Sequence, residues 1–149
     1  MTSDVEATVD QINVVVDDVG ASAEFLDALG VKVADTLAEW MPHHRTVEST
    51  ASGFGVDLDS SAFAAEWGGL PRSWKGIVLG VRVRGRGAVD AIYERALAAG
   101  ATRRRAPYDA FWGARIAIVE TQNGLVLALM SPSEEDARRP PPDPSTLSG

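Results

Sequence analysis

The order of predicted elements repeats once along the chain, and this repeat constrains the fold more than any other feature. A β-branched strand at 11–16, a helix ended by Gly30 and further strands come first. A strand at 76–83, a helix ended by Gly100 and further strands follow. Each copy has the order β-α-β-β-β. We therefore predict an α+β fold built from two tandem βαβββ modules that share one site or one core.

The strands of the two modules are read from apolar periodicity and turn residues. In the first module we predict a strand over 31–40 and two more from "RTVEST" and "FGVDLD". In the second, "TQNG" joins two strands of a hairpin. The predicted division is a lead-in at 1–8, a first module at 9–59, a connector at 60–74, a second module at 75–132, and a proline-rich tail at 133–149 that is disordered or a loose strap.

Both predicted helices have an apolar stripe. Asp17 or Asp18 is expected to cap the first, which presents Phe25, Leu26 and Leu29 to the core. The inward residues of the second are expected to be Val89, Ile92, Tyr93, Ala96 and Leu97.

Composition excludes several classes of function. The 149 residues contain no cysteine, which rules out disulfides, thiolate metal sites and a cysteine nucleophile, and fits a cytoplasmic location. No apolar run approaches the length of a membrane span. The formal net charge of −7 disfavours nucleic acid and favours cationic small molecules. We expect a cytoplasmic protein with neither a membrane nor a nucleic-acid partner.

Two segments, "QINVVVDDVGASAEFLDALGVKV" and "GARIAIVETQNGLVLALMSP", occupy matching places in the repeat. Over about residues 9–132 the sequence resembles the vicinal oxygen chelate superfamily, which includes glyoxalase I, extradiol dioxygenases and bleomycin-resistance proteins. The resemblance implies that the paired βαβββ modules form curved mixed sheets around a cleft, and that the protein is a homodimer.

Metal-using members of that superfamily place ligands on the first and last strands of each module. By position the resemblance assigns these places to Gln11, a residue near Asp57, Val78 and Ala128. Alkyl side chains at two of the four positions cannot donate a lone pair, so we predict no metal and no cofactor. Gln11 and Asp57 are then expected to be a hydrogen-bonded polar pair in the cleft.

Two adjacent histidines, His43 and His44, fall in a predicted loop. Neighbours in an extended segment point opposite ways, so both are not expected to reach one ion. We interpret them as surface histidines.

The aromatic residues supply the remaining candidates for a ligand site. Those expected near the mouth of the cleft, at strand ends or in connectors, are Trp40, Trp67, Trp74, Trp112, Phe111 and Phe54. Rings in such places offer stacking and cation–π contacts, although tryptophans also plug loops and dimer seams. We expect at least two of the four tryptophans to contact ligand.

The sequence thus predicts a metal-independent small-molecule binding protein of the bleomycin-resistance type. It would sequester a flat aromatic ligand, cationic or neutral, in an acidic, aromatic-lined cleft. The alternative is a lyase, isomerase or dioxygenase with a degenerate metal site, or an enzyme using an acid–base residue of the cleft. A third reading is a partner-binding module that uses the proline-rich tail.

Overall fold

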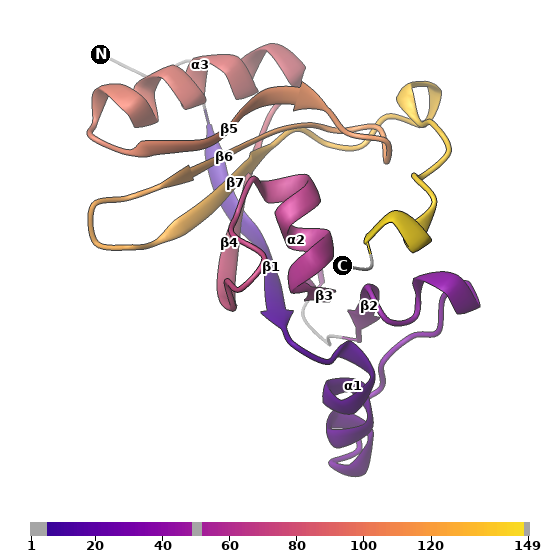
Figure 1. The fold of residues 1–149 in the computed structure, drawn as a ribbon. Coiled ribbons are helices and arrows are strands. Elements are labelled where there is room, and N and C mark those ends of the chain that lie inside the picture. Colours follow the sequence, from indigo (N-terminus) through magenta and orange to yellow (C-terminus); the bar gives the residue numbers. More distant parts are fainter. Residues whose placement is uncertain (1–5, 49–51, 148–149) are drawn as a thin grey trace. The chain divides into compact units, whose positions relative to one another are not determined.

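The computed structural model describes residues 6–48 and 52–147, so the lead-in before residue 6 and the end of "RTVEST" lie outside the described residues (Figure 1). The chain forms two compact units. Unit 1 comprises Met1–Val9 and Leu79–Pro141, and unit 2 comprises Asp10–Val78 and Pro142–Gly149. The boundaries fall within strands β1 (Ala7–Val16) and β4 (Gly76–Val83).

Unit 2 contains a mixed sheet with strand order β2-β3-β1. Strand β1 pairs in parallel with β3 (Gly55–Ser60), which pairs antiparallel with β2 (His44–Val47). Helix α1 (Val19–Ala28) provides the crossover that a parallel pair requires. The α+β class and the mixed sheet of the sequence prediction are confirmed.

Alternation along β3 decides what each face of this sheet holds. Val56 and Leu58 join the apolar core beneath α1. Asp57 and Asp59 alternate with them in sequence and therefore project from the opposite face. One face of the sheet is thus apolar and covered by a helix, and the other carries polar groups.

Helix α1 starts as predicted but buries a different stripe. The side chain of Asp18 accepts a hydrogen bond from the Ala21 amide at 2.9 Å and caps the helix. The buried positions are Val19 and Ala23, with Leu26 partly buried against them.

The predicted core positions Phe25 and Leu29 are 66% and 65% exposed, so that part of the prediction is wrong. The two residues share one face of the helix, displaced from the face that meets the sheet.

Two segments of unit 2 differ from their predicted structure. In 31–40, Val33 makes an isolated bridge to Val47 and a 3-10 helix, η1 (Ala38–Trp40), follows. Alanine, aspartate and glutamate are poor strand formers, which explains why the expected strand is lost. The predicted connector at 60–74 contains helix α2 (Ser61–Gly68).

Local signals explain α2. Ser60 caps it by accepting a hydrogen bond from the Phe63 amide at 3.0 Å. Gly69 ends it with φ of +62°, a conformation that favours glycine.

Unit 1 contains strands in the order β4-β7-β6-β5, with helix α3 against the β5, β6 and β7 strands (Figure 1). The bounds are α3 Arg86–Ala98, β5 Thr102–Asp109, β6 Arg115–Glu120 and β7 Val126–Met130. The predicted hairpin joins β6 to β7, and Gly124 has φ of +88° in its turn. The predicted inward face of α3 is confirmed: Val89 and Tyr93 are buried in the core, and Ile92, Ala96 and Leu97 pack against it.

The described part of the tail, predicted to be disordered or a loose strap, contains two short 3-10 helices. They are η2 (Glu135–Ala137) in unit 1 and η3 (Pro144–Leu147) in unit 2. The Glu134 amide donates to the Gly113 carbonyl at 3.0 Å, and Leu147 is only 3% exposed. Within 6–48 and 52–147, no helix is long and apolar enough to cross a membrane.

Candidate functional site

Polar side chains gather on the face of the unit 2 sheet opposite α1. The register places Asn13 of β1 and Thr46 of β2 beside Asp57 of β3, and His44 beside Asp59. Residues two apart on a strand share a face, so the strands contribute two polar residues each. We call this surface the polar face; its members are Gln11, Asn13, His44, Thr46, Asp57 and Asp59.

The structure brings the predicted pair Gln11 and Asp57 together. Gln11 Nε2 donates to Asp57 Oδ2 at 3.2 Å and to Asn13 Oδ1 at 2.9 Å. Thr46 Oγ1 donates to Asp57 Oδ1 at 3.0 Å. Burial raises the pKa of Asp57, as does the charge of Asp59, while His44 and the Thr46 hydrogen bond oppose the rise.

Asp59 and His44 form a tighter pair, which the sequence analysis missed. Asp59 is 0% exposed, and its Oδ1 lies 2.6 Å from His44 Nδ1. Its other oxygen accepts from Asn13 Nδ2 at 2.7 Å. The interpretation of His44 as a surface loop residue is therefore wrong: it begins β2 and is half-buried against a carboxylate.

The charges around His44 favour its protonated form. Burial is the largest single influence and lowers the pKa of His44. The hydrogen bond to Asp59 and the charges of Asp59 and Asp57 together outweigh it, so the pKa is raised from its usual value.

His43 has different surroundings. Its Nδ1 lies 2.9 Å from the Oγ of Ser60, the residue that caps α2. Burial lowers the pKa of His43. The neighbouring histidines thus have separate partners, Ser60 and Asp59, consistent with the prediction that they do not share an ion.

The donor set does not fit the divalent metal that the resemblance implies. Gln11 uses its amide nitrogen to hold Asp57 and Asn13. Val78 and Ala128 are buried alkyl side chains, 0% and 1% exposed. In the part of the chain that the structure describes, no group of three or more histidine, aspartate or glutamate residues is placed to hold a metal.

Two of the predicted ligand-binding tryptophans are buried in unit 2. Trp40 and Trp67 are 8% and 5% exposed, which leaves little ring surface for a ligand. Trp40 packs edge-on against Phe63 with ring centroids 5.1 Å apart. Trp67 lies on α2, so the expectation that every tryptophan lies outside helices is wrong.

The other aromatic candidates keep part of their surface. Phe111 and Trp112 of unit 1 are half-buried and pack edge-to-face at 5.1 Å. Trp74 and Phe54 of unit 2 are half-buried as well. Trp74 covers Gly76, where a Cβ atom would lie 3.3 Å from the indole ring. Contact of these four with a ligand stays a prediction.

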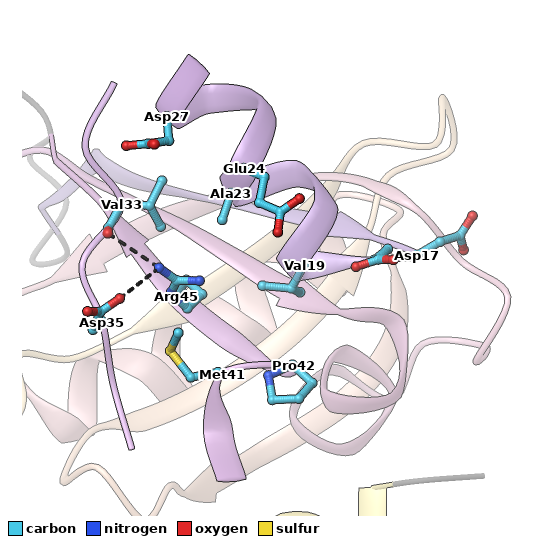
Figure 2. A pocket seen from close by; sticks show the side chains of 12 residues that line it. Asp17, Val19, Ala23, Glu24, Asp27, Val33, Asp35, Met41, Pro42 and Arg45 are labelled. Atoms are coloured by element: carbon cyan, nitrogen blue, oxygen red, sulfur yellow. Dashed lines mark hydrogen bonds and ion pairs between the residues drawn. The ribbon is translucent and has the colours of Figure 1, made fainter. Parts of the chain in front are cut away.

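A pocket of about 790 Å³ lies on the other side of the unit 2 sheet, between α1 and the chain that leads into β2 (Figure 2). Arg45 lines it and is held by Ala34 O at 2.8 Å and Asp35 at 3.2 Å. Figure 2 shows Glu24 and Asp27 of α1 around the same pocket. None of the predicted site residues is among those lining it. Arg45 lies between His44 and Thr46 in β2, so its side chain points to the opposite face of the sheet. This alternation could have placed Arg45 on the side away from the polar face.

Comparison with protein families identifies the class. A family model described as the Glyoxalase/Bleomycin resistance protein/Dioxygenase superfamily matches residues 8–129. The chain belongs to this superfamily. A search of curated proteins found no match.

Solved structures share the fold at low sequence identity. A structure titled NAD-dependent benzaldehyde dehydrogenase from Legionella pneumophila has a TM-score of 0.60 and 14% identity, covering 81% of this chain and 96% of its own. Methylmalonyl-CoA epimerase from Mycobacterium tuberculosis has a TM-score of 0.57 and 20% identity, covering 87% and 90%. The Mn(II)-bound glyoxalase from Novosphingobium aromaticivorans has a TM-score of 0.58 and 18% identity; 89% of this chain matches 41% of that longer chain.

Proposed function

We propose that this protein binds a flat aromatic small molecule, cationic or neutral, on the polar face of unit 2 without a divalent metal. The observation that carries the proposal is the half-buried Asp57, held by Gln11 and Thr46 beside Asp59. Two carboxylates and one histidine leave this face acidic. A partly desolvated carboxylate attracts a cation more strongly than a surface carboxylate does.

Aromatic contact supplies the second part of the binding energy in this proposal. Trp74 and Phe54 of unit 2 are the candidates within the same unit, because each is only half-buried. A cation over a tryptophan face contributes about 0.5–2 kcal/mol, with the upper value requiring desolvation. Contact of Trp112 and Phe111, which belong to unit 1, stays a separate prediction from the sequence. Binding of this kind serves sequestration, as in the bleomycin-resistance type.

The alternative is a lyase, isomerase or dioxygenase that uses a degenerate metal site. Its metal would need donors at positions where this chain has Val78 and Ala128, which have none. The proposed assembly is a symmetric homodimer, since closed two-fold pairing is the commonest arrangement of soluble oligomers. Light scattering at micromolar concentration tests the assembly separately.

A matched pair of probes tests the binding proposal. N-methylacridinium and acridine have the same ring system, and only the first is charged at pH 8. We expect both to quench tryptophan fluorescence and to raise the thermal midpoint, because a ligand selective for the native state stabilises it. Asp57→Asn should weaken the cation more than the neutral ring, and Trp74→Ala should weaken both by about tenfold, or roughly 1.4 kcal/mol.

Glu94→Gln provides the control, because it removes one exposed carboxylate from α3 in unit 1. It should change neither affinity beyond a small uniform effect of net charge. Equal binding of N-methylacridinium by the wild type and Asp57→Asn would place the charged site elsewhere. Equal binding by Trp74→Ala would remove that ring from the site.

A further inference from the structure

The carboxylate of Asp59 has a geometry that orients a neighbouring base. It is fully buried, and both oxygens accept short hydrogen bonds, from His44 Nδ1 at 2.6 Å and Asn13 Nδ2 at 2.7 Å. A buried carboxylate held from two sides has little freedom to rotate. It therefore fixes the plane of the His44 ring and the nitrogen that faces it.

The same hydrogen bond determines where the free lone pair of the imidazole lies. An ionised carboxylate only accepts, so the proton of the neutral His44 ring resides on Nδ1. The lone pair is then on Nε2, away from Asp59. Phe63 of α2 packs edge-on against the ring at 5.8 Å, while 36% of the His44 side chain remains exposed. The imidazole is thus held on two sides and accessible to a small molecule.

We propose that His44 is a general base that removes a proton from a carbon acid bound on the polar face, with Asp59 as its positioning residue. The inference rests on the proposed function, because the substrate occupies the same site. A histidine oriented through Nδ1 by a carboxylate, with Nε2 free, is an established arrangement for proton transfer. The substrate class is a flat molecule with an acidic C–H bond.

The step requires no oxidant or metal. The proton moves from carbon to Nε2, and the C–H electron pair moves to an electron-accepting group of the same molecule. The charged groups that face His44 are Asp57 and Asp59 of β3, and both favour the imidazolium that forms. Its other neighbours named here, Asn13, Thr46 and Phe63, carry no charge.

Ring opening of 5-nitrobenzisoxazole tests this capability with a flat neutral probe. A base removes the C3 proton, its electron pair forms the C≡N bond, and the N–O bond breaks to release a coloured phenolate. We expect His44→Gln to lower the rate roughly a hundredfold, the lower end of what a positioned general base contributes. His43→Gln is the matched control and should retain the wild-type rate.

Asp59→Asn tests whether Asp59 positions the His44 ring or only stabilises the fold. It should lower kcat with little change in KM and shift the rate profile to lower pH, because the imidazolium loses its negative partner. The chain has two histidines, so nitrogen-15 NMR of the wild type reports the tautomer of each directly. The neutral His44 ring should carry its proton on Nδ1.

Different results would contradict the general base at His44 and the binding function of the polar face. A wild-type rate no higher than that of His44→Gln overturns the general base, as does a neutral His44 with its proton on Nε2. If N-methylacridinium still binds the wild type through Asp57 in that case, the binding function stands without catalysis. Loss of that binding as well would overturn both.

Discussion

Strands β3 and β7 close their modules in matching places of the repeat, yet they carry opposite chemistry. Strand β3, "GVDLDS", alternates apolar residues with Asp57 and Asp59. Strand β7, "VLALM", is apolar throughout, and Ala128 is only 1% exposed. The α3 side of β7 is a core of the expected kind, containing Leu129. The opposite face of β7 is also apolar, whereas the corresponding face of β3 carries Asp57 and Asp59.

The two modules therefore share the element order of the repeat but differ in the chemistry of their last strands. In unit 2, strands β1 and β2 supply Asn13, Gln11 and His44, which satisfy the two carboxylates of β3. In unit 1, β7 lies between β4 and β6, and Ile118 of β6 faces Ala128. A carboxylate is tolerated only where neighbouring strands provide donors.

The largest test of this comparison moves a carboxylate into the apolar strand. Ala128→Asp should lower the free energy of unfolding by about 3–5 kcal/mol, the effect of leaving a buried charge without a partner. Urea unfolding at neutral pH measures it. Ala128→Ser, with a similar volume and no charge, should cost much less. A loss below about 1 kcal/mol for Ala128→Asp would mean that unit 1 also offers a polar partner at this position.

The second test uses pH, because both histidines of the chain lie in unit 2. The pKa of His44 is raised above 6.5 in the folded state, so its contribution to stability is full below 6.5 and is lost as pH rises through the folded pKa. The pKa of His43 is lowered below 6.5, so its contribution is present above 6.5 and is lost as pH falls through the folded pKa.

Urea unfolding between about pH 5 and 9 covers both contributions. His44→Gln should remove the decline in stability above pH 6.5, and His43→Gln should leave that decline in place. The effect is modest because more than a third of the His44 side chain meets solvent, which screens its charges. A decline that persists in His44→Gln would assign it to another group.

Much of the fold follows from periodicity, and the failures have local causes. The stripe of α3 was predictable because its apolar residues define a single face of the helix. Helix α2 was not predicted, although Ser60 and Gly69 mark its ends, because the glycines and proline after it favoured a connector. Trp67 therefore lies buried in a helix and not in a connector.

The candidate site was predictable only in part. Gln11 and Asp57 were assigned by the resemblance to the superfamily, and their hydrogen bond follows from the parallel pairing of β1 with β3. The His44–Asp59 pair depends on the antiparallel register of β2 with β3. That register was inaccessible while "MPHH" was interpreted as a loop, because a shift by one residue would direct His44 to the other face.

The smallest expected effect lies on α1, where the sequence predicted the wrong stripe. Phe25 is 66% exposed, so Phe25→Ala should change the free energy of unfolding by less than about 0.5 kcal/mol. Val19 is 1% exposed in the same helix, and Val19→Ala should cost about 2 kcal/mol through lost burial and the space left behind. Alanine has the higher helix propensity in both cases, which slightly favours each variant. Urea unfolding at two protein concentrations compares them, and a concentration-dependent loss in Phe25→Ala as large as that of Val19→Ala would show that this face is covered in solution.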